Sequence, residues 1–132
     1  MAEHLVINID KAKLGHQLNG DNGEIGHWLK KRGDRALSAA KRQVGVKTGG
    51  LRNSIRMSHL TNSTGQYLTI WTMHRIAAIH HNGTRPHIIT PKQGNKVLRF
   101  TRGAQVVYTR RVRHPGTKPN RFLADQLVYF IP

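Results

Sequence analysis

Histidine is the residue type in this chain that most directly suggests chemistry. The sequence contains nine histidines, and five of them fall within 41 residues: His74, His80, His81, His87 and His114. Imidazole is a common ligand of transition metals. No Asp or Glu occurs between Asp34 and Asp125, however, and a hydrolytic metal site normally uses carboxylates as ligands or as a general base. We therefore expect neither a metal site nor any other cofactor.

The same shortage of carboxylates argues against other active sites. His80 and Asn82 are residue types that small nucleases use, but the carboxylate and the second spaced histidine of such a site are missing. A Ser-His-Asp triad would have to use Asp125, which falls on an expected amphipathic helix, where a surface charge is the simpler interpretation. The run from Thr48 to Leu51 lacks the lysine and the spacing of a phosphate-binding loop. We expect no catalytic residues and no enzymatic activity.

Charge is the strongest signal in the composition. The 132 residues include 22 Lys and Arg but only 6 Asp and Glu, which gives a net charge of +16 with neutral histidines. Such an excess favours a polyanionic partner, because binding to phosphates releases condensed counterions. The basic residues are spread along the chain, so a solvated basic surface is the alternative interpretation.

Cysteine usage and hydropathy indicate where the chain is made. The sequence has no cysteine, which excludes disulfides and thiolate zinc sites and is typical of a reducing compartment. No apolar run approaches the ~20 residues that a membrane-spanning helix needs. Residues 1–10 lack the apolar region of a secretory signal. We expect a protein made in a cytoplasm, without membrane contact.

The elements that would position these residues begin with a long helix. Between Asn22 and Val44, apolar residues recur at helical spacing and define one face. They are Ile25, Trp28, Leu29, Ala36, Leu37, Ala40 and Val44. Asp21 or Asn22 is expected to cap the start of this helix, and Gly45 to end it.

Short strands and further helices are predicted around the long helix. Strands are expected at 5–9, within 51–59, and at 67–73, 87–89, 96–100 and 105–112. A short helix is expected from its cap Asp10 to Leu18, and a closing helix from Asn120 to Phe130. The predicted fold class is α+β: a long N-terminal helix packed on a four- to five-stranded, mainly antiparallel sheet, with a C-terminal helix. Residues 1–132 are expected to form a single domain.

Two groups of residues receive a structural interpretation. Alternate residues of the strand at 67–73 share a face, and we favour core packing there over a base-stacking surface; they are Tyr67, Thr69, Trp71 and Met73. Several glycines stand where strands must turn and where a positive φ is needed; they are Gly83, Gly94, Gly103 and Gly116. The loops 61–65 and 90–95 are expected to be mobile.

Four segments of the sequence occur in a characteristic order. They are Val46-Lys47-Thr48-Gly49-Gly50-Leu51-Arg52-Asn53-Ser54-Ile55, then His81 to Pro91 with its Gly83-Thr84 step, followed by Leu98-Arg99-Phe100, then Val112 to Pro119 with its Gly116-Thr117 step, and finally Arg121-Phe122-Leu123. In this order they resemble the HK97 gp10-like family of phage proteins. The resemblance covers residues 22–130, and residues 1–20 form an N-terminal extension outside it. The residues that it marks as fold-defining are Thr48, Gly49, Leu51, Gly83, Thr84, Pro86, His114, Pro115, Gly116, Phe122 and Leu123.

The resemblance implies a structural virion protein of a tailed bacteriophage neck, which joins head to tail or completes the top of the tail. Such proteins form closed homo-oligomeric rings, here expected to be hexamers, and a ring requires heterologous contacts between neighbours. Candidate subunit or partner contacts are Thr90, Lys92, Gln93, Asn95, Lys96 and Arg99. Duplex DNA would pass through the lumen without being read in sequence. Candidate contacts to this DNA are Arg52, Arg56, Arg110, Arg111 and Arg113.

Partners of such a ring would be neighbouring neck and tail proteins, in the virion and in the host cytoplasm during assembly. Other functions stay open. The ring could be a tail terminator that caps the tail tube, and its charge could meet acidic partner proteins rather than DNA. A free-standing nucleic-acid-binding protein would bind DNA non-specifically as a monomer. A metal-dependent nuclease would cleave DNA only with divalent ions.

Overall fold

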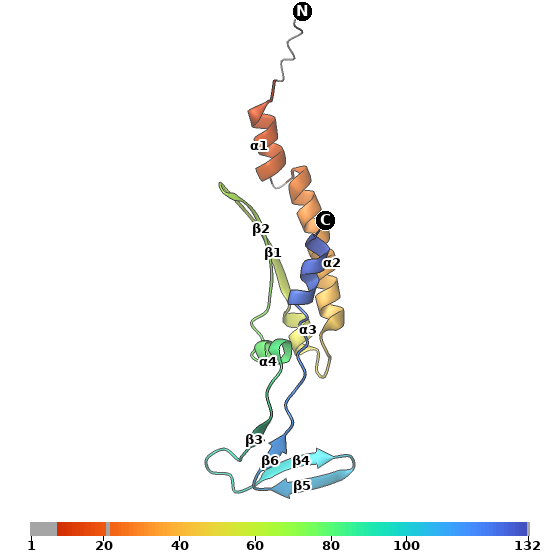
Figure 1. Ribbon diagram of the computed structural model, residues 1–132, viewed down its shortest axis with the longest axis vertical. Helices are drawn as coiled ribbons and strands as arrows, with labels where there is room; N and C mark the ends of the chain where they lie inside the picture. Colours follow the sequence, from red (N-terminus) through yellow and green to blue (C-terminus); the bar gives the residue numbers. More distant parts are fainter. Residues whose placement is uncertain (1–7, 21, 132) are drawn as a thin grey trace, which may run out of the picture. The chain divides into compact units, whose positions relative to one another are not determined.

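The computed structural model describes residues 8–20 and 22–131 (Figure 1). The helices are α1 (Lys11–Asn19), α2 (Glu24–Gln43), α3 (Gly50–Ser54), α4 (Ala77–Asn82) and the 3-10 helix η1 (Ala124–Phe130). The strands are β1 (Arg56–Asn62), β2 (Gly65–Trp71), β3 (His87–Ile89), β4 (Leu98–Arg102), β5 (Gln105–Thr109) and β6 (Val112–His114). Of the strand expected at 5–9, residues 5–7 lie outside the described part, and Asn8 and Ile9 are not in a strand.

The chain divides into two compact units. Unit 1 combines residues 8–75, apart from residue 21, with residues 122–131, and unit 2 consists of residues 76–121. Unit 2 is therefore inserted between two segments of unit 1. That the whole chain acts as a single domain stays a prediction.

The α+β class and the long N-terminal helix are confirmed, but the predicted sheet of four to five strands is wrong. The strands form three separate antiparallel pairs, β1–β2, β3–β6 and β4–β5. The strand predicted at 105–112 breaks at Arg110 and Arg111, where the chain stops pairing with β4 and starts pairing with β3. Helix α4, which is not among the elements expected from the sequence, follows β2 along the chain. A change of pairing partner and an intervening helix leave no continuous sheet.

Both ends of α1 are capped by side chains. Asp10 caps the start, as predicted, because its carboxylate accepts hydrogen bonds of 3.0 Å from the N–H groups of Ala12 and Lys13. At the other end, the side-chain amide of Gln66 on β2 donates to the carbonyl oxygen of Leu18 over 2.9 Å. Gln66 thus satisfies a carbonyl that the helix leaves unpaired and ties α1 to the β1–β2 hairpin.

The start of α2 differs from the prediction. The helix begins after Gly23 rather than after Asn22, and the other predicted cap, Asp21, lies outside the described residues. Glycine has no side chain with which to cap. Gln17 of α1 supplies the missing acceptor, since its side-chain oxygen accepts a 3.1 Å hydrogen bond from the N–H of Glu24. The first helix therefore caps the second.

Small residues form the buried stripe of α2. The buried positions are Gly26, Gly33, Ala36 and Ala40, and Val44 follows them at the helix end. The predicted apolar face is correct over its C-terminal half, whereas Ile25 and Trp28 are largely exposed. Gly33 shows why small residues are used: an added Cβ there would collide with Leu68 and would lie 2.7 Å from the sulfur of Met57. The helix thus packs closely against β1 and β2.

Residues 50–54, where the sequence pattern predicts no helix, form the short helix α3. Gly49 adopts a φ of 80°, in the left-handed region that glycine favours, and starts α3. The short helix places Leu51 in the core, and the chain then enters β1 behind Ile55, which is fully buried. Within the loop expected at 61–65 the chain forms a tight turn, because the side-chain oxygen of Asn62 accepts hydrogen bonds of 2.9 Å and 3.1 Å from the N–H groups of Thr64 and Gly65.

The closing helix is a 3-10 helix that packs on α2, and not the longer helix predicted from Asn120 to Phe130. Its N–H groups bond three residues back, as Gln126 does to Leu123 over 3.2 Å. Gln126 is buried, and its amide donates to Gln43 of α2 over 2.6 Å. At the far end of η1, Arg32 of α2 donates to the carbonyl oxygen of Tyr129 over 2.6 Å. Side chains of α2 therefore hold both ends of η1.

Candidate functional site

The two Gly-Thr steps of the sequence meet in unit 2. Thr84 and Thr117 form an antiparallel bridge in which the N–H of each donates to the carbonyl oxygen of the other, over 3.0 Å and 3.1 Å. Their hydroxyl oxygens lie 3.0 Å apart. Gly83 and Gly116, which precede them, have φ values of 71° and 88°. The bridge closes the β3–β6 ribbon at the end where β3 begins and β6 ends.

Histidines beside this bridge make local hydrogen bonds. The ring of His87 donates from Nδ1 to the carbonyl oxygen of Arg85 over 2.9 Å. The Nδ1 of His114 accepts a 3.0 Å hydrogen bond from the N–H of Gly116. The two rings face each other across the ribbon, with centroids 5.0 Å apart. Among residues 8–20 and 22–131, no three His, Cys, Asp or Glu side chains are grouped so that they could hold a metal ion.

Unit 2 buries very little of its own apolar surface. Among residues 76–121, all of which are described, Ala77 is the single buried residue. Large apolar side chains are instead exposed on its strands and loops, including Ile88 at 60% and Tyr108 at 63%. The others are Ile76, Ile79, Ile89, Val97, Phe100 and Val106. A two-stranded ribbon without a packed face is at most marginally stable in water.

Charge is as unevenly distributed as apolar burial. Residues 76–121 contain ten Lys and Arg and no Asp or Glu, whereas all six carboxylate side chains of the sequence lie outside this range. No carboxylate of unit 2 can therefore neutralise any of its basic groups. A surface of this composition attracts polyanions or acidic proteins.

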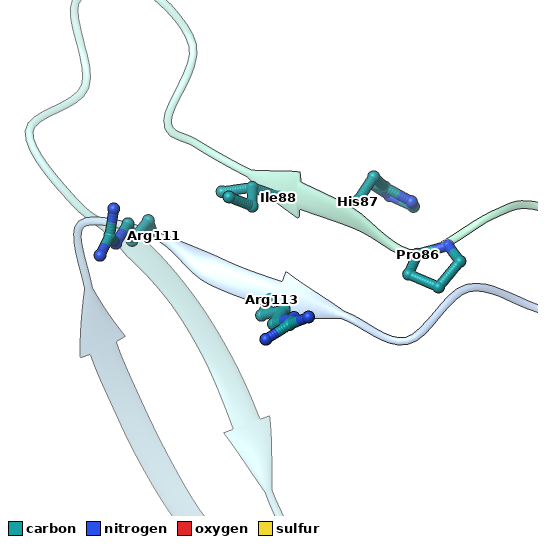
Figure 2. Close-up of a pocket in the computed structure, with 5 residues that line it drawn as sticks. All are labelled: Pro86, His87, Ile88, Arg111 and Arg113. Atoms are coloured by element: carbon teal, nitrogen blue, oxygen red, sulfur yellow. The ribbon is translucent and has the colours of Figure 1, made fainter.

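A cleft of about 480 Å³ lies in the β3–β6 ribbon, and Figure 2 shows the residues that line it. The β6 side contributes Arg111 and Arg113, and the β3 side contributes Pro86, His87 and Ile88. Arg113 pairs directly with Ile88 in the strand register, so their side chains leave the ribbon on the same face. The cleft therefore combines two guanidinium groups with an apolar wall.

The structure brings together some of the arginines predicted to contact DNA. Arg111 and Arg113 share the cleft, and Arg110 is exposed beside them in the chain. Arg52 and Arg56 belong to unit 1, where they are exposed on α3 and at the start of β1. His87 and Ile88 of the cleft were not predicted as site residues. Only the register of β3 against β6, which the sequence does not reveal, places them opposite the arginines.

The residues predicted to contact a neighbouring subunit are all exposed. Thr90, Lys92, Gln93, Asn95 and Lys96 lie on the loop between β3 and β4, and Arg99 lies on β4. Within the loop, the N–H of Asn95 donates to the carbonyl oxygen of Lys92 over 3.0 Å, which forms a turn at Gly94.

The interpretation of the 67–73 strand as a core strand on its Trp71 side is wrong for this chain. Tyr67, Thr69 and Trp71 face outward, and the intervening Leu68 and Ile70 are the less exposed residues. Leu68 approaches Gly33 of α2, which shows that this face of the hairpin packs inward. The sequence contains a usable signal, since an alternating Leu-Ile pair is more apolar than Tyr-Thr-Trp.

The outward hairpin face carries a defined set of side chains. In the register of β1 against β2, Arg56 lies opposite Trp71, and Leu60 lies opposite Tyr67. All four are exposed, and Leu60 is the most exposed of the three apolar residues at 64%. Unit 1 thus presents an aromatic and aliphatic strand face as a second candidate interaction surface.

No helix in the described part of the chain is both long and apolar enough to cross a membrane. Comparison with family models, with curated proteins and with solved structures gave no match to this chain.

Proposed function

We propose that this chain is a structural protein of a tailed-bacteriophage neck, which joins head to tail or completes the top of the tail as an oligomeric ring around the DNA channel. Two lines of argument support the proposal. The first is the resemblance of four ordered segments to the HK97 gp10-like family. The second, which carries most weight, is the near absence of buried side chains in unit 2.

A unit with so many exposed apolar side chains is expected in a protein that buries them by associating with other chains. Ile88 and Tyr108 lie on two different strand pairs, and both would gain from burial at about 25 cal/mol per Å² of apolar surface. Copies of the same chain supply a covering surface at every position of a ring. The outward hairpin face of unit 1 is a suitable counterpart because it exposes the large apolar side chains Leu60, Tyr67 and Trp71. Arg56 is the basic residue of the same face.

Charge favours contacts between unlike surfaces over contacts between two copies of unit 2. Two such units brought together would place ten basic groups on each side with no carboxylate between them. Repulsion of this kind disfavours a two-fold arrangement in which unit 2 meets itself. A contact between unit 2 and a different surface of the next copy is heterologous, and heterologous contacts that close produce rings.

The experiment that tests the proposal is native mass spectrometry with negative-stain imaging of the purified chain. We expect closed rings. Tyr108→Ser removes an apolar side chain from unit 2 and should shift the population toward monomers. Leu127→Ser is the matched control, since Leu127 is similarly exposed at 65% but lies on η1 of unit 1. A chain that stays monomeric up to the highest soluble concentration would contradict the proposal.

A second candidate is a free-standing protein that binds nucleic acid without sequence preference. The observation in its favour is the ten basic and no acidic residues of unit 2. Such a protein would bind duplex DNA as a monomer, with affinity that falls steeply with salt. The mass of the DNA complex separates the two functions. A free-standing binding protein would bind DNA as one chain, whereas a neck protein would bind it as a complete ring.

A further inference from the structure

We propose that the cleft of the β3–β6 ribbon is a phosphate-backbone site for duplex DNA, in which Arg111 and Arg113 hold successive phosphates of one strand. The choice of duplex DNA as the ligand rests on the proposed function, in which DNA passes through the ring. The existence of an anion site at this cleft rests on the geometry and charge of unit 2 alone.

The two guanidinium groups are not neutralised from within unit 2, which contains no Asp or Glu. Neither Arg111 nor Arg113 has a hydrogen-bond or ion-pair partner for its guanidinium among residues 8–20 and 22–131. The nearest carboxylates along the sequence, Asp34 and Asp125, both belong to unit 1. Arginine presents planar N–H pairs that match phosphate oxygens, and such charge-assisted bonds are stronger than neutral ones. An anion from outside the chain is therefore the natural occupant of the cleft.

The spacing of the arginines favours a chain of phosphates over a single ion. Arg111 immediately precedes β6 and Arg113 is its central residue, and both line the same cleft. Two residues of extended chain span about 6.5 Å. That separation is comparable to the distance between neighbouring phosphates of one DNA strand. Pro86 and Ile88 contribute an apolar wall, and His87 between them is the single uncharged polar side chain that lines the cleft. Few groups are therefore available there to read base edges. The site therefore holds the backbone without recognising sequence.

The ribbon is fixed at one end, which sets the two sides of the cleft relative to each other. The Thr84–Thr117 bridge lies two residues before Pro86 and three after His114. The register of β3 against β6 then places Ile88 opposite Arg113. Because this pairing already exists in the free chain, little ordering of backbone is needed when the anion binds.

The test compares two variants that lose the same charge from unit 2. Arg111→Gln with Arg113→Gln removes both cleft guanidiniums. Arg102→Gln with Lys118→Gln removes two exposed basic groups from outside the cleft. Binding of a fluorescent duplex of arbitrary sequence is measured by anisotropy over a range of salt concentrations. Circular dichroism and the mass of the particle are recorded for every variant.

The cleft variant should bind the duplex at least about tenfold more weakly at low salt, and its slope of log K against log salt should fall by about two, since each lost phosphate contact removes about 0.9. The control should lose clearly less affinity and slope. Equal losses in the two variants would overturn the site, as would undetectable binding of the duplex by the unmodified chain at low salt. Tighter binding of a single strand of the same length would also overturn it.

The outcome for the cleft is distinguishable from the outcome for the ring. If rings form but the two variants bind alike, the cleft proposal fails and the ring stands. If the chain is monomeric and only the cleft variant loses binding, the site is supported and the ring is contradicted.

Discussion

Gly83 and Gly116 occupy reciprocal positions across the bridge of unit 2: the space for a side chain on each is filled by the carbonyl oxygen of the threonine that follows the other. A Cβ on Gly83 would lie 2.5 Å from the carbonyl oxygen of Thr117, and a Cβ on Gly116 would collide with that of Thr84. These are backbone atoms that already hold the bridge together, so they cannot move aside without breaking it. Glycine is required at both positions for space as well as for its φ.

Gly116→Ala should therefore open the base of the β3–β6 ribbon. We expect a loss above the about 1–3 kcal/mol that backbone strain alone costs. Gly103→Ala is the control, because Gly103 also has a positive φ, of 63°, but has nothing within 4 Å of an added Cβ. Hydrogen exchange at the N–H groups of Thr84 and Thr117 is the measurement. If Thr84 and Thr117 are equally protected from exchange in the two variants, the close contact of position 116 with the backbone of Thr84 does not determine the stability of the bridge.

Glycines inside the two N-terminal helices should respond in opposite ways to substitution. Gly15→Ala on α1 meets nothing within 4 Å and should raise stability by about 0.5–1 kcal/mol through helix propensity. Gly33→Ala on α2 gains the same propensity but forces Leu68 and Met57 to shift, and overpacking costs about 1–3 kcal/mol. Urea unfolding followed by circular dichroism should rank Gly33→Ala below Gly15→Ala. The reverse order would mean that β1 and β2 can move away from α2.

Phe122 should be the most important single side chain of unit 1. It is fully buried, at 0% exposure, so Phe122→Ala should cost about 3–5 kcal/mol. Leu127→Ala, at a side chain of the same closing segment that is 65% exposed, should change the stability by less than about 1 kcal/mol. Thermal unfolding of the two variants checks this contrast. Similar losses would indicate that Leu127 is covered in the assembled protein.

The loop between β3 and β4 provides a test of its predicted role in subunit contacts. Deleting Gln93 to Asn95 removes exposed residues and leaves both strands intact, so the cost to folding is small. If the loop reaches a neighbour, ring formation should fall while the circular dichroism spectrum is unchanged. Native mass spectrometry gives the result, and unchanged assembly would remove this loop from the interface.

An unpaired nitrogen near the core of unit 1 predicts an improvement in stability. The Nδ1 atom of His74 is buried without a hydrogen-bond partner in the structure, and an unsatisfied buried polar atom costs about 1–3 kcal/mol. His74→Phe replaces the imidazole by a somewhat larger aromatic ring without polar atoms, so the free energy of unfolding should rise if the site accommodates the added volume. Urea titration measures this free energy directly. A decrease in the free energy of unfolding would show that the Nδ1 atom has a partner, such as water, in solution.

Local signals in the sequence predicted the fold well where a residue acts on its own neighbours. Asp10 caps α1 because its carboxylate needs only the next turn, and the Asn62 turn depends on an oxygen two residues from its donor. The predicted cap of α2 was wrong because the observed capping interaction is not local. Its acceptor comes from Gln17, seven residues earlier and on another helix, which no capping pattern describes.

The sequence did not predict which strands pair with each other. The residues from 105 to 112 have one continuous β pattern, yet their pairing changes from β4 to β3 at Arg110 and Arg111. Nothing in the types of those residues marks the change. The same limit applies to the cleft, where the arginines were predicted as DNA contacts and the opposing His87 and Ile88 were identified only through the register.

The insertion of unit 2 within unit 1 has a consequence for synthesis on the ribosome. The chain emerges with its N-terminal segment first, so α2, α3 and the β1–β2 hairpin leave the exit tunnel well before Phe122 and η1. Until then α2 lacks the closing helix η1 that packs on it. Unit 2 is entirely translated during that interval. Nascent unit 1 therefore stays incompletely packed until residues 122–131 have emerged. Its exposed apolar surface is a target for chaperones during this interval.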